Sequence, residues 1–290
     1  MSEPQSTAGT HGPRPAYVEL VLDAATKQYG SARSRFTAVD AVTATFTSDQ
    51  TVGVVGESGS GKSTLAKMLV GFETPNGGRV TFNGESVAQV VKSRSGRMDF
   101  RRAVQFIGQD TTSSFDPRRR LDDSVLLPLR TLLGLSDGEA RARMAETLDA
   151  LRLPVALASR YPFEVSGGQR QRFAIARGLV VRPRILVCDE VVSALDVSVQ
   201  GAILNLIKDY CEQHSAGLIF VSHGLPATGF VAQELLVMYH GRMVERGPSA
   251  QVFADPQHAY TRSLLNAYRG EPTLEPVGDD DLDPALTVAS

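Results

Sequence analysis

The chain has 290 residues, of which 42% are hydrophobic and 21% are charged, and its formal net charge is −2. The composition is typical of a soluble globular protein, and the length is sufficient for one large α/β domain with an appendage or for two small domains. The net charge gives no global argument for a nucleic-acid partner. Two cysteines, Cys188 and Cys211, are too few for a disulfide framework or a cysteine-ligated metal cluster. No apolar run approaches the ~18 residues of a membrane span, and the N-terminus lacks the pattern of a signal peptide. We therefore expect another chain to supply any membrane part of the function.

The N-terminal part is predicted to be a tail followed by strands. Residues 1–15 are polar and rich in proline and glycine, a composition that predicts a disordered tail. Strand-like runs follow at 17–22, 41–46 and 51–55. Tyr29, between the first two runs, has two interpretations. It either anchors a sheet edge, the commoner role of an isolated aromatic residue, or stacks on a nucleotide base.

The motif that organises the chain follows the third of these strands and opens a helical pattern. It consists of Gly56, Glu57, Ser58, Gly59, Ser60, Gly61, Lys62, Ser63 and Thr64. Its glycines allow a tight turn that directs successive N–H groups at an anion, and the helix adds its positive dipole end. Lys62 is expected to reach the β- and γ-phosphates, and Ser63 to offer a hydroxyl to Mg²⁺. A plain Gly/Ser surface loop is the competing interpretation, but the flanking strand and helix argue against it. The motif predicts a nucleoside triphosphate site.

Beyond this motif the pattern changes from strands to helices. Strand-like runs at 79–82 and 103–107 are separated by a basic segment, and the second run ends close to Gln109. From residue 121 to 158, apolar side chains recur at helical spacing without a strand pattern, which predicts an inserted helical subdomain. The predicted division is a tail at 1–15, a first part of the nucleotide-binding core at 16–112, the helical subdomain at 113–165, a second part of the core at 166–248, a helical extension at 249–270 and an acidic tail at 271–290.

A second glycine-rich turn opens another predicted helix and consists of Ser166, Gly167, Gly168 and Gln169. Because a helix N-terminus attracts anions, this turn is a second candidate phosphate contact. A serine cap followed by glycines is equally an ordinary helix start. The turn lacks a lysine and a preceding buried strand, so it is not a second complete phosphate loop.

Two apolar strands in the second half end in residues that carry chemistry. The run 184–188 leads to Asp189 and Glu190, and the run 218–221 leads to His223. Ligands bind at the carboxyl ends of buried parallel strands. Asp189 is therefore a candidate Mg²⁺ ligand, and Glu190 is a candidate base for an attacking water. A lone histidine is more often structural, but this position favours a γ-phosphate contact for His223.

In this order and spacing, the motifs resemble those of an ABC-type ATPase from about residue 17 to residue 247. The resemblance implies an α/β fold, namely a P-loop NTPase (RecA-like) core with an antiparallel β subdomain and an inserted α-helical subdomain. It also implies that the chain binds ATP and Mg²⁺ and couples ATP hydrolysis to transport.

The same resemblance implies a role for each motif. Residues 56–64 correspond to Walker A and residues 185–190 to Walker B, with Ser63 and Asp189 as Mg²⁺ ligands. The other implied roles are an ATP-contacting signature at 165–169, a glutamine loop whose Gln109 serves both metal binding and catalysis, a D-loop that contains the helix-capping Asp196, a switch histidine at His223 and a base-stacking aromatic at Tyr29. The chain departs from the family at Val165, where leucine is usual, and at Val191-Val192, where proline and then threonine or serine are usual.

A finer resemblance connects the chain to the oligopeptide/dipeptide/nickel importer ATPases. It lies in residues 109–118 and in the C-terminal His-x-Tyr-Thr-x-x-Leu-Leu element at 258–265. The resemblance implies an ATPase subunit for import of peptides or related small solutes, such as nickel or metal chelates. Its implied partners are permease chains at the cytoplasmic face of the membrane and, indirectly, an extracytoplasmic solute-binding protein. Many members carry a cysteine-rich C-terminal element suited to an iron–sulfur cluster, but no cysteine follows Cys211 here, so we predict no cluster.

Two alternative functions remain on the same fold. One is an accessory ATPase of a phosphonate-degrading lyase complex, whose cassettes resemble this importer subgroup. The other is a nucleic-acid ATPase, supported only by basic residues at 94–102 and Arg118–Arg120. Such basic runs are usually solvated faces, so we expect no nucleic-acid partner.

The arrangement of the two anion-receptive turns predicts a dimer. One chain holds a complete phosphate loop and a bare second turn, and an insert separates them. We therefore expect two ATPase subunits, identical or paralogous, packed head to tail so that each signature caps the ATP on its neighbour's loop. The segment after Gln109, including Phe115 and Arg118–Arg120, is expected to contact the permease.

Overall fold

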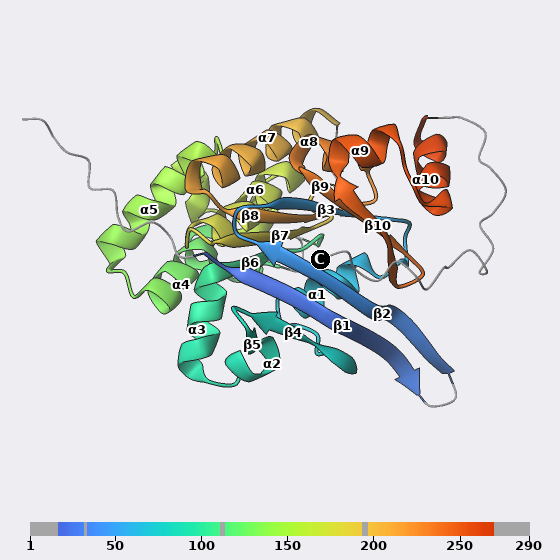
Figure 1. The fold of residues 1–290 in the computed structure, drawn as a ribbon. Coiled ribbons are helices and arrows are strands. Elements are labelled where there is room, and N and C mark those ends of the chain that lie inside the picture. Colours follow the sequence, from blue (N-terminus) through green and yellow to red (C-terminus); the bar gives the residue numbers. More distant parts are fainter. Residues whose placement is uncertain (1–16, 32–33, 111–113, 193–196, 270–290) are drawn as a thin grey trace, which may run out of the picture.

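The computed structural model describes residues 17–31, 34–110, 114–192 and 197–269. This part of the chain contains a six-stranded, mostly parallel sheet and a four-stranded antiparallel sheet (Figure 1). The antiparallel sheet lies on one side of the parallel sheet, and several long helices cover the other side. This arrangement confirms the predicted α/β class with an antiparallel β subdomain.

The six-stranded sheet positions the functional residues because five of its strands are parallel. Its order is β10, β9, β3, β8, β7 and β6, with β10 antiparallel to β9. The bounds in this order are Arg242–Pro248, Glu234–Tyr239, Thr51–Val55, Gly217–Val221, Ile185–Asp189 and Val104–Ile107. Strands β3, β8 and β7 are buried along nearly their whole length, which explains why their sequences are apolar without alternation. Their carboxyl ends meet at one edge of the sheet.

The antiparallel sheet corrects the predicted strand lengths. Its order is β2, β1, β4 and β5, with bounds Ser34–Thr47, Glu19–Ser31, Gly77–Phe82 and Glu85–Ser86. The predicted strands at 17–22 and 41–46 are therefore too short, and Tyr29 lies within β1 opposite Phe36. Two physical reasons explain the difference. The distal half of the hairpin is exposed and lacks an apolar face, and register shifts between Leu22 and Gln28 interrupt the alternation.

Helices pack on both faces of the parallel sheet. Helix α1, Lys62–Leu69, lies between the two sheets, and its buried Leu65, Met68 and Leu69 join both in one apolar cluster. The short α2 and α3, Val87–Val90 and Arg94–Ala103, follow β5, so the basic segment is largely helical. On the opposite face lie α6, α7 and α8, with bounds Gly167–Leu179, Val197–His214 and Leu225–Val231 (Figure 1).

A helical region lies at one end of the sheet. It contains α4, α5 and two short 3₁₀ helices, η1 and η2, with bounds Leu121–Leu133, Asp137–Ala150, Val155–Ser159 and Pro162–Glu164. Its apolar side chains form one cluster with α6 and α7. The helical character predicted for this region is observed, whereas the boundaries of the six predicted segments stay a prediction. Among the described residues, no helix is both long and apolar enough to cross a bilayer.

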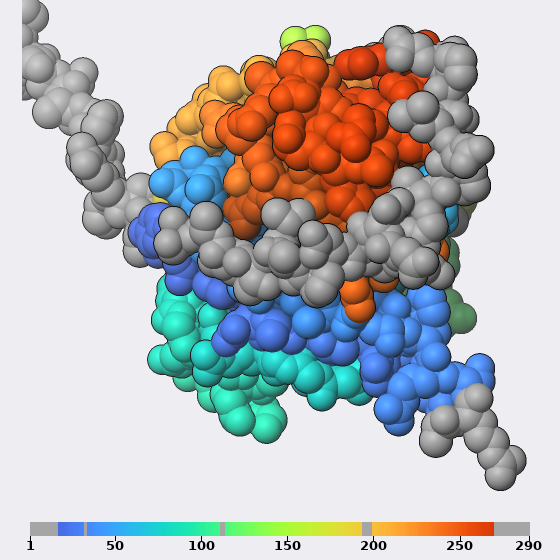
Figure 2. All heavy atoms as spheres, turned by 45° about the vertical axis from the view of Figure 1, so that its right-hand side comes forward, coloured from blue at the N-terminus to red at the C-terminus, as the bar shows by residue number. Residues whose placement is uncertain are grey.

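The C-terminal extension packs on the far edge of the sheet. It consists of α9, Ser249–Ala254, and α10, Ala259–Arg269. Apolar side chains of both helices form a cluster with β3, β9 and β10. In Figure 2 these orange-red elements form a continuous surface above the blue and cyan antiparallel sheet. The extension is therefore built onto the same strand, β3, that leads into the glycine-rich loop.

Candidate active site

The loop after β3 requires glycine at defined points. Gly56, Gly59 and Gly61 have φ values of 150°, 85° and 102°, a region that other residues rarely adopt. A Cβ atom on Gly56 would overlap the carbonyl of Met238, and one on Gly61 would overlap the carbonyl of Ala38. The loop can therefore turn this tightly only because these positions carry no side chain.

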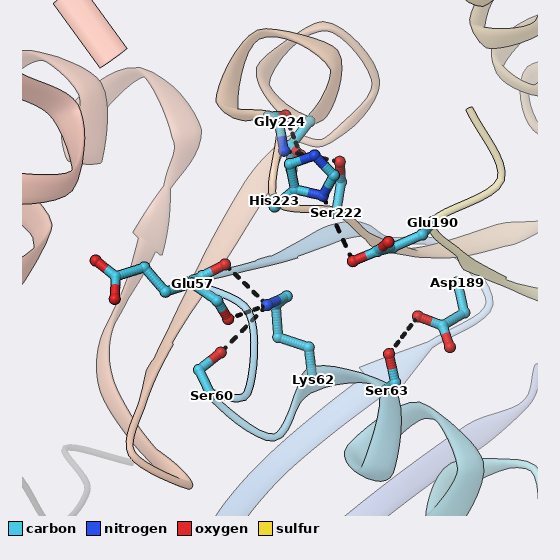
Figure 3. Close-up of polar contacts among 11 residues, drawn as sticks. Glu57, Ser60, Lys62, Ser63, Asp189, Glu190, Ser222, His223 and Gly224 are labelled. Atoms are coloured by element: carbon cyan, nitrogen blue, oxygen red, sulfur yellow. Dashed lines mark hydrogen bonds and ion pairs between the residues drawn. The ribbon is translucent and has the colours of Figure 1, made fainter. Parts of the chain in front are cut away.

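Lys62 begins helix α1 and returns along the loop. Its Nζ donates to the carbonyl oxygens of Gly56 and Glu57, at 2.8 and 2.6 Å, and to Ser60 Oγ at 3.2 Å (Figure 3). Only 4% of Lys62 is exposed. The loop therefore holds the ammonium group at a defined place rather than leaving it on a mobile side chain.

The electrostatics of Lys62 result from burial and nearby carboxylates. Burial lowers the pKa of its ammonium group, and the charges of Glu190, Asp189 and Glu57 oppose that shift. Water screens charges weakly in such a setting, so a buried ammonium interacts strongly with an anion bound by the loop. This is the electrostatic environment that a phosphate chain requires.

Ser63 and Asp189 provide oxygen atoms suited to a hard cation. The Ser63 hydroxyl, in the first turn of α1, donates to Asp189 Oδ1 at the end of β7, at 2.9 Å (Figure 3). Burial raises the pKa of the Asp189 carboxyl, and the hydrogen bond from Ser63 lowers it. Mg²⁺ takes oxygen ligands and usually binds through one or two carboxylates together with phosphates and water. The two side chains fit this ion, and Gln109 lines a cleft together with Ser63.

Glu190 and His223 form a second polar pair beside the loop. His223 Nδ1 lies 3.5 Å from Glu190 Oε1, and the Glu190 N–H donates to the Val221 carbonyl at 2.9 Å (Figure 3). Glu190 has a φ of 52°, a left-handed conformation that is strained for a glutamate. Strain of this kind is concentrated at functional sites, where the surrounding structure holds it in place. The Glu190 side chain is 18% exposed, so water can reach it.

Two clefts adjoin the loop. The first, of about 350 Å³, is lined by Tyr29, Phe36, Ala38, Ser58, Gly59, Gly61, Lys62, Ser63, Thr64, Gln109 and Glu190. The second, of about 380 Å³, is lined by Gly56, Glu57, Ser58, Glu190, His223 and Leu264. The structure thus brings Tyr29, Gln109 and the predicted residues of the loop and the strand ends to one region.

Phe36 is a cleft residue that the motifs missed. It faces Tyr29 across the β1–β2 hairpin, and both rings are partly exposed. An aromatic pair of this kind can accept a planar base by stacking. The sequence shows an aromatic residue at position 36, but only the register between β1 and β2 shows that it lies opposite Tyr29.

The signature turn forms the start of helix α6. Ser166 and Gln169 form a capping box at the start of α6, with N···O distances of 2.9 and 3.2 Å. Residues 166–169 line neither of the two clefts described above. The signature turn is therefore not part of the lining of these two clefts.

The sequence motifs also missed a contact between α6 and the segment after Glu190. Gln171 Nε2 donates to the carbonyl oxygen of Val191 at 2.7 Å, and the bond is buried. Val191 and Val192 are themselves buried, so apolar packing holds this segment where the family has proline. No local signal distinguishes Gln171 from the polar residues around it.

The predictions for Asp196 and Phe115 are not confirmed. The predicted helix cap Asp196 lies outside the described residues. Phe115 is 3% exposed and the Arg177 guanidinium lies 4.8 Å from its ring centroid, so its ring is not on the exposed surface of this segment, whereas the contact of the segment with the permease stays a prediction. An apolar ring beside a buried helix gains more from burial than from exposure. Arg118–Arg120 are exposed, as expected.

A glycine-rich loop between a buried strand and a helix, with acidic residues at the end of another parallel strand of the same sheet, defines the class of P-loop NTPases. The sequence profile of the family described as ABC transporter matches residues 39–193. The chain belongs to the ABC transporter family, and the predictions of this family, of its fold and of an ATPase coupled to transport are confirmed.

Individual relatives agree with this assignment. The chain is 41% identical over 239 residues to a putative peptide import ATP-binding protein of Brucella abortus, covering 81% of this chain and 71% of the relative. It is 40% identical over 230 residues to an oligopeptide transport ATP-binding protein of Lactococcus lactis, covering 79% and 72%. Its structure is similar to that of the ATP-binding cassette MJ0796, a dimer bound to ADP and Pi, with a TM-score of 0.73, 26% identity and coverage of 79% and 98%.

Proposed function

We propose that this chain is the ATP-hydrolysing subunit of an importer for peptides or related small solutes, such as metal chelates. The single observation that carries the proposal is the convergence of Lys62, Ser63, Asp189, Glu190 and His223 at one edge of the parallel sheet. The names of the Brucella and Lactococcus relatives support the solute class. The C-terminal resemblance to the same importers supports it independently.

The residues at this edge divide the chemistry among them. The loop N–H groups and Lys62 bind the β- and γ-phosphates, and Tyr29 with Phe36 receives the base. Ser63 and Asp189, together with Gln109, would hold Mg²⁺, which neutralises phosphate charge when bound. Glu190 orients and deprotonates the attacking water, and His223 contacts the γ-phosphate.

The proposal includes a second ATPase subunit. Ser166 to Gln169, at the N-terminus of α6, line neither of the two clefts beside the loop, and MJ0796, a similar cassette, was solved as a dimer. In the proposed head-to-tail pair, each signature turn caps the ATP of its neighbour. Binding of ATP closes the pair and hydrolysis releases it, which drives the permease between two states.

The remaining partners follow from this role. Permease chains hold the pair at the cytoplasmic face of the membrane, and an extracytoplasmic protein delivers the solute. We retain the predictions of no nucleic-acid partner and no iron–sulfur cluster. We do not carry forward the lyase accessory or the nucleic-acid ATPase, because no observation favours either.

The test is reconstitution of the chain with its proposed permease chains. We expect ATP-dependent uptake of labelled peptides into liposomes, with a Lys62→Ala complex as the inactive control. Co-purification with soluble lyase subunits instead of permeases would contradict the importer. ATPase activity stimulated by duplex DNA or RNA and lost with added salt would indicate the nucleic-acid alternative.

A further inference from the structure

The peptide group between Gly56 and Glu57 is held from two opposite sides. Its carbonyl oxygen accepts from Lys62 Nζ at 2.8 Å, and its N–H donates to the hydroxyl of Tyr260 at 2.9 Å. In a trans peptide the C=O and the N–H point in opposite directions. Lys62 therefore holds this group from inside the site, and Tyr260 holds it from the C-terminal helix α10.

Tyr260 is well placed to act as a rigid acceptor. It is 3% exposed and shares an apolar cluster with Val55, the last residue of β3, and Leu265. Its ring centroid lies 4.1 Å from that of Tyr239 at the end of β9. Burial raises the pKa of Tyr260 to about 12, so the phenol is neutral at physiological pH. Its hydroxyl can therefore offer the same acceptor atom throughout the working range.

The position of Tyr260 is set by strand β10 rather than by the loop. The Glu245 carboxylate accepts from the N–H groups of Gln257 and His258, at 2.8 and 3.1 Å. These groups lie just before α10, where a helix start leaves N–H groups without intrahelical partners. The Arg262 guanidinium donates to the carbonyl of Gln257 at 2.9 Å and so closes the first turn. The extension is thus a fixed support that reaches from β10 to the loop.

Gly56 makes the orientation of this peptide group easy to lose. Its φ of 150° is readily adopted only by glycine, and glycine has no Cβ to restrict rotation of the following peptide. A flipped peptide would turn its N–H toward the Lys62 ammonium and remove one of the acceptors of Lys62. A contact on the N–H therefore selects the orientation in which the C=O faces the lysine.

We propose that Tyr260 is a positioning residue for ATP binding: its hydroxyl fixes the Gly56–Glu57 peptide so that Lys62 is preorganised for the phosphates. The C-terminal extension is then part of the nucleotide site and not only a surface appendage. Leu264, one turn later on α10, lines the cleft that contains Glu190 and His223, which places the extension against this site at a second point. The inference rests on the proposed role of the loop in ATP binding.

The experiment compares Tyr260→Phe with Tyr268→Phe in the full-length chain and in the permease complex. Tyr268 lies on the same helix and is 58% exposed, so it is a matched control. For Tyr260→Phe we expect the Kd and KM for ATP to rise about 3- to 10-fold, the effect of one lost hydrogen bond, while kcat stays near the wild-type value. The Glu57 amide should also exchange its hydrogen faster. Tyr268→Phe should leave all four quantities unchanged.

Thermal unfolding and one further variant separate the possible outcomes. All assays are run well below the unfolding midpoint of Tyr260→Phe. A lower midpoint with unchanged ATP KM would show a merely structural role and overturn the inference. Lys62→Ala tests the proposed site itself. If Lys62→Ala loses ATP and Tyr260→Phe binds it normally, only the positioning role is wrong. If Lys62→Ala still binds ATP normally, the proposed site is wrong.

Discussion

Replacement of Glu190 tests the chemistry of the site and the strain of its backbone separately. Glu190→Gln keeps the shape of the side chain but cannot accept a proton from water. We expect kcat to fall about 10²- to 10⁴-fold. At 1.36 kcal/mol for each factor of ten, this raises the activation free energy by about 3–5 kcal/mol. ATP binding should persist, because the loop and Lys62 carry the phosphate contacts.

The φ of 52° at Glu190 allows the free-energy cost of the backbone strain to be derived. A left-handed conformation costs an L-residue about 1–2 kcal/mol, and glycine does not incur this cost. Glycine also raises the conformational entropy of the unfolded chain, which offsets about 0.4–1 kcal/mol of the stability gained by removing the strain. Glu190→Gly and Glu190→Ala remove the same carboxylate, so their difference isolates the backbone. We expect the glycine variant to have a free energy of unfolding about 1 kcal/mol above that of the alanine variant.

Two assays measure these effects. Phosphate release by the assembled complex gives kcat, and thermal unfolding gives the stability of the variants. A difference of 1 kcal/mol shifts the midpoint by roughly 2–4 °C in a domain of this size class. Wild-type turnover in Glu190→Gln would refute the role of Glu190 as the base. Equal midpoints for the alanine and glycine variants would refute the strain.

Three further predictions concern other residues of the site. Lys62→Ala should reduce ATP affinity in titration calorimetry far more than Tyr29→Ala, which loses a base stack of about 1–3 kcal/mol; equal losses would contradict this ranking. Ser166→Arg should leave ATP binding to the single chain nearly intact but abolish ATP-dependent dimerisation and turnover in the complex, and normal turnover would exclude a shared site. Gln171→Leu leaves the buried Val191 carbonyl without its donor, which should lower the free energy of unfolding by about 1–3 kcal/mol in a denaturant titration; an unchanged midpoint would disprove this.

The features that could be predicted from the sequence have local signals. The glycine-rich loop is a contiguous motif. Asp189 is the last residue of the buried apolar strand β7, and His223 lies two residues after the end of the buried apolar strand β8. Carboxyl ends of parallel strands meet at one edge, so chain order alone places these side chains together. The start of α6 was likewise predictable, because a serine followed three residues later by glutamine forms a capping box.

The features that could not be predicted depend on contacts between distant segments. The hydrogen bond of Tyr260 joins residues 203 positions apart, and nothing around Tyr260 specifies Glu57 as its partner. The pairing of Tyr29 with Phe36 depends on the register of an exposed hairpin, which has no apolar alternation to define it. Phe115 stands between uncharged polar residues and a charged run in the sequence, yet its ring is buried. Pattern rules detect periodicity and short motifs, but neither of these specifies a contact between distant segments.

Helix α6 connects residues that would act on the two different ATP molecules of the proposed pair. Its N-cap, Ser166, would meet the ATP of the neighbouring subunit, and Gln171, five residues later, holds the backbone beside Glu190 of its own chain. The two points are only about 7 Å apart along the helix axis, and a single rigid element joins them. A displacement of the signature turn by the neighbouring subunit's ATP would thus also move the backbone beside Glu190, which acts on the ATP of its own chain. The two hydrolysis events of the proposed pair should consequently be cooperative, with a Hill coefficient for ATP above one.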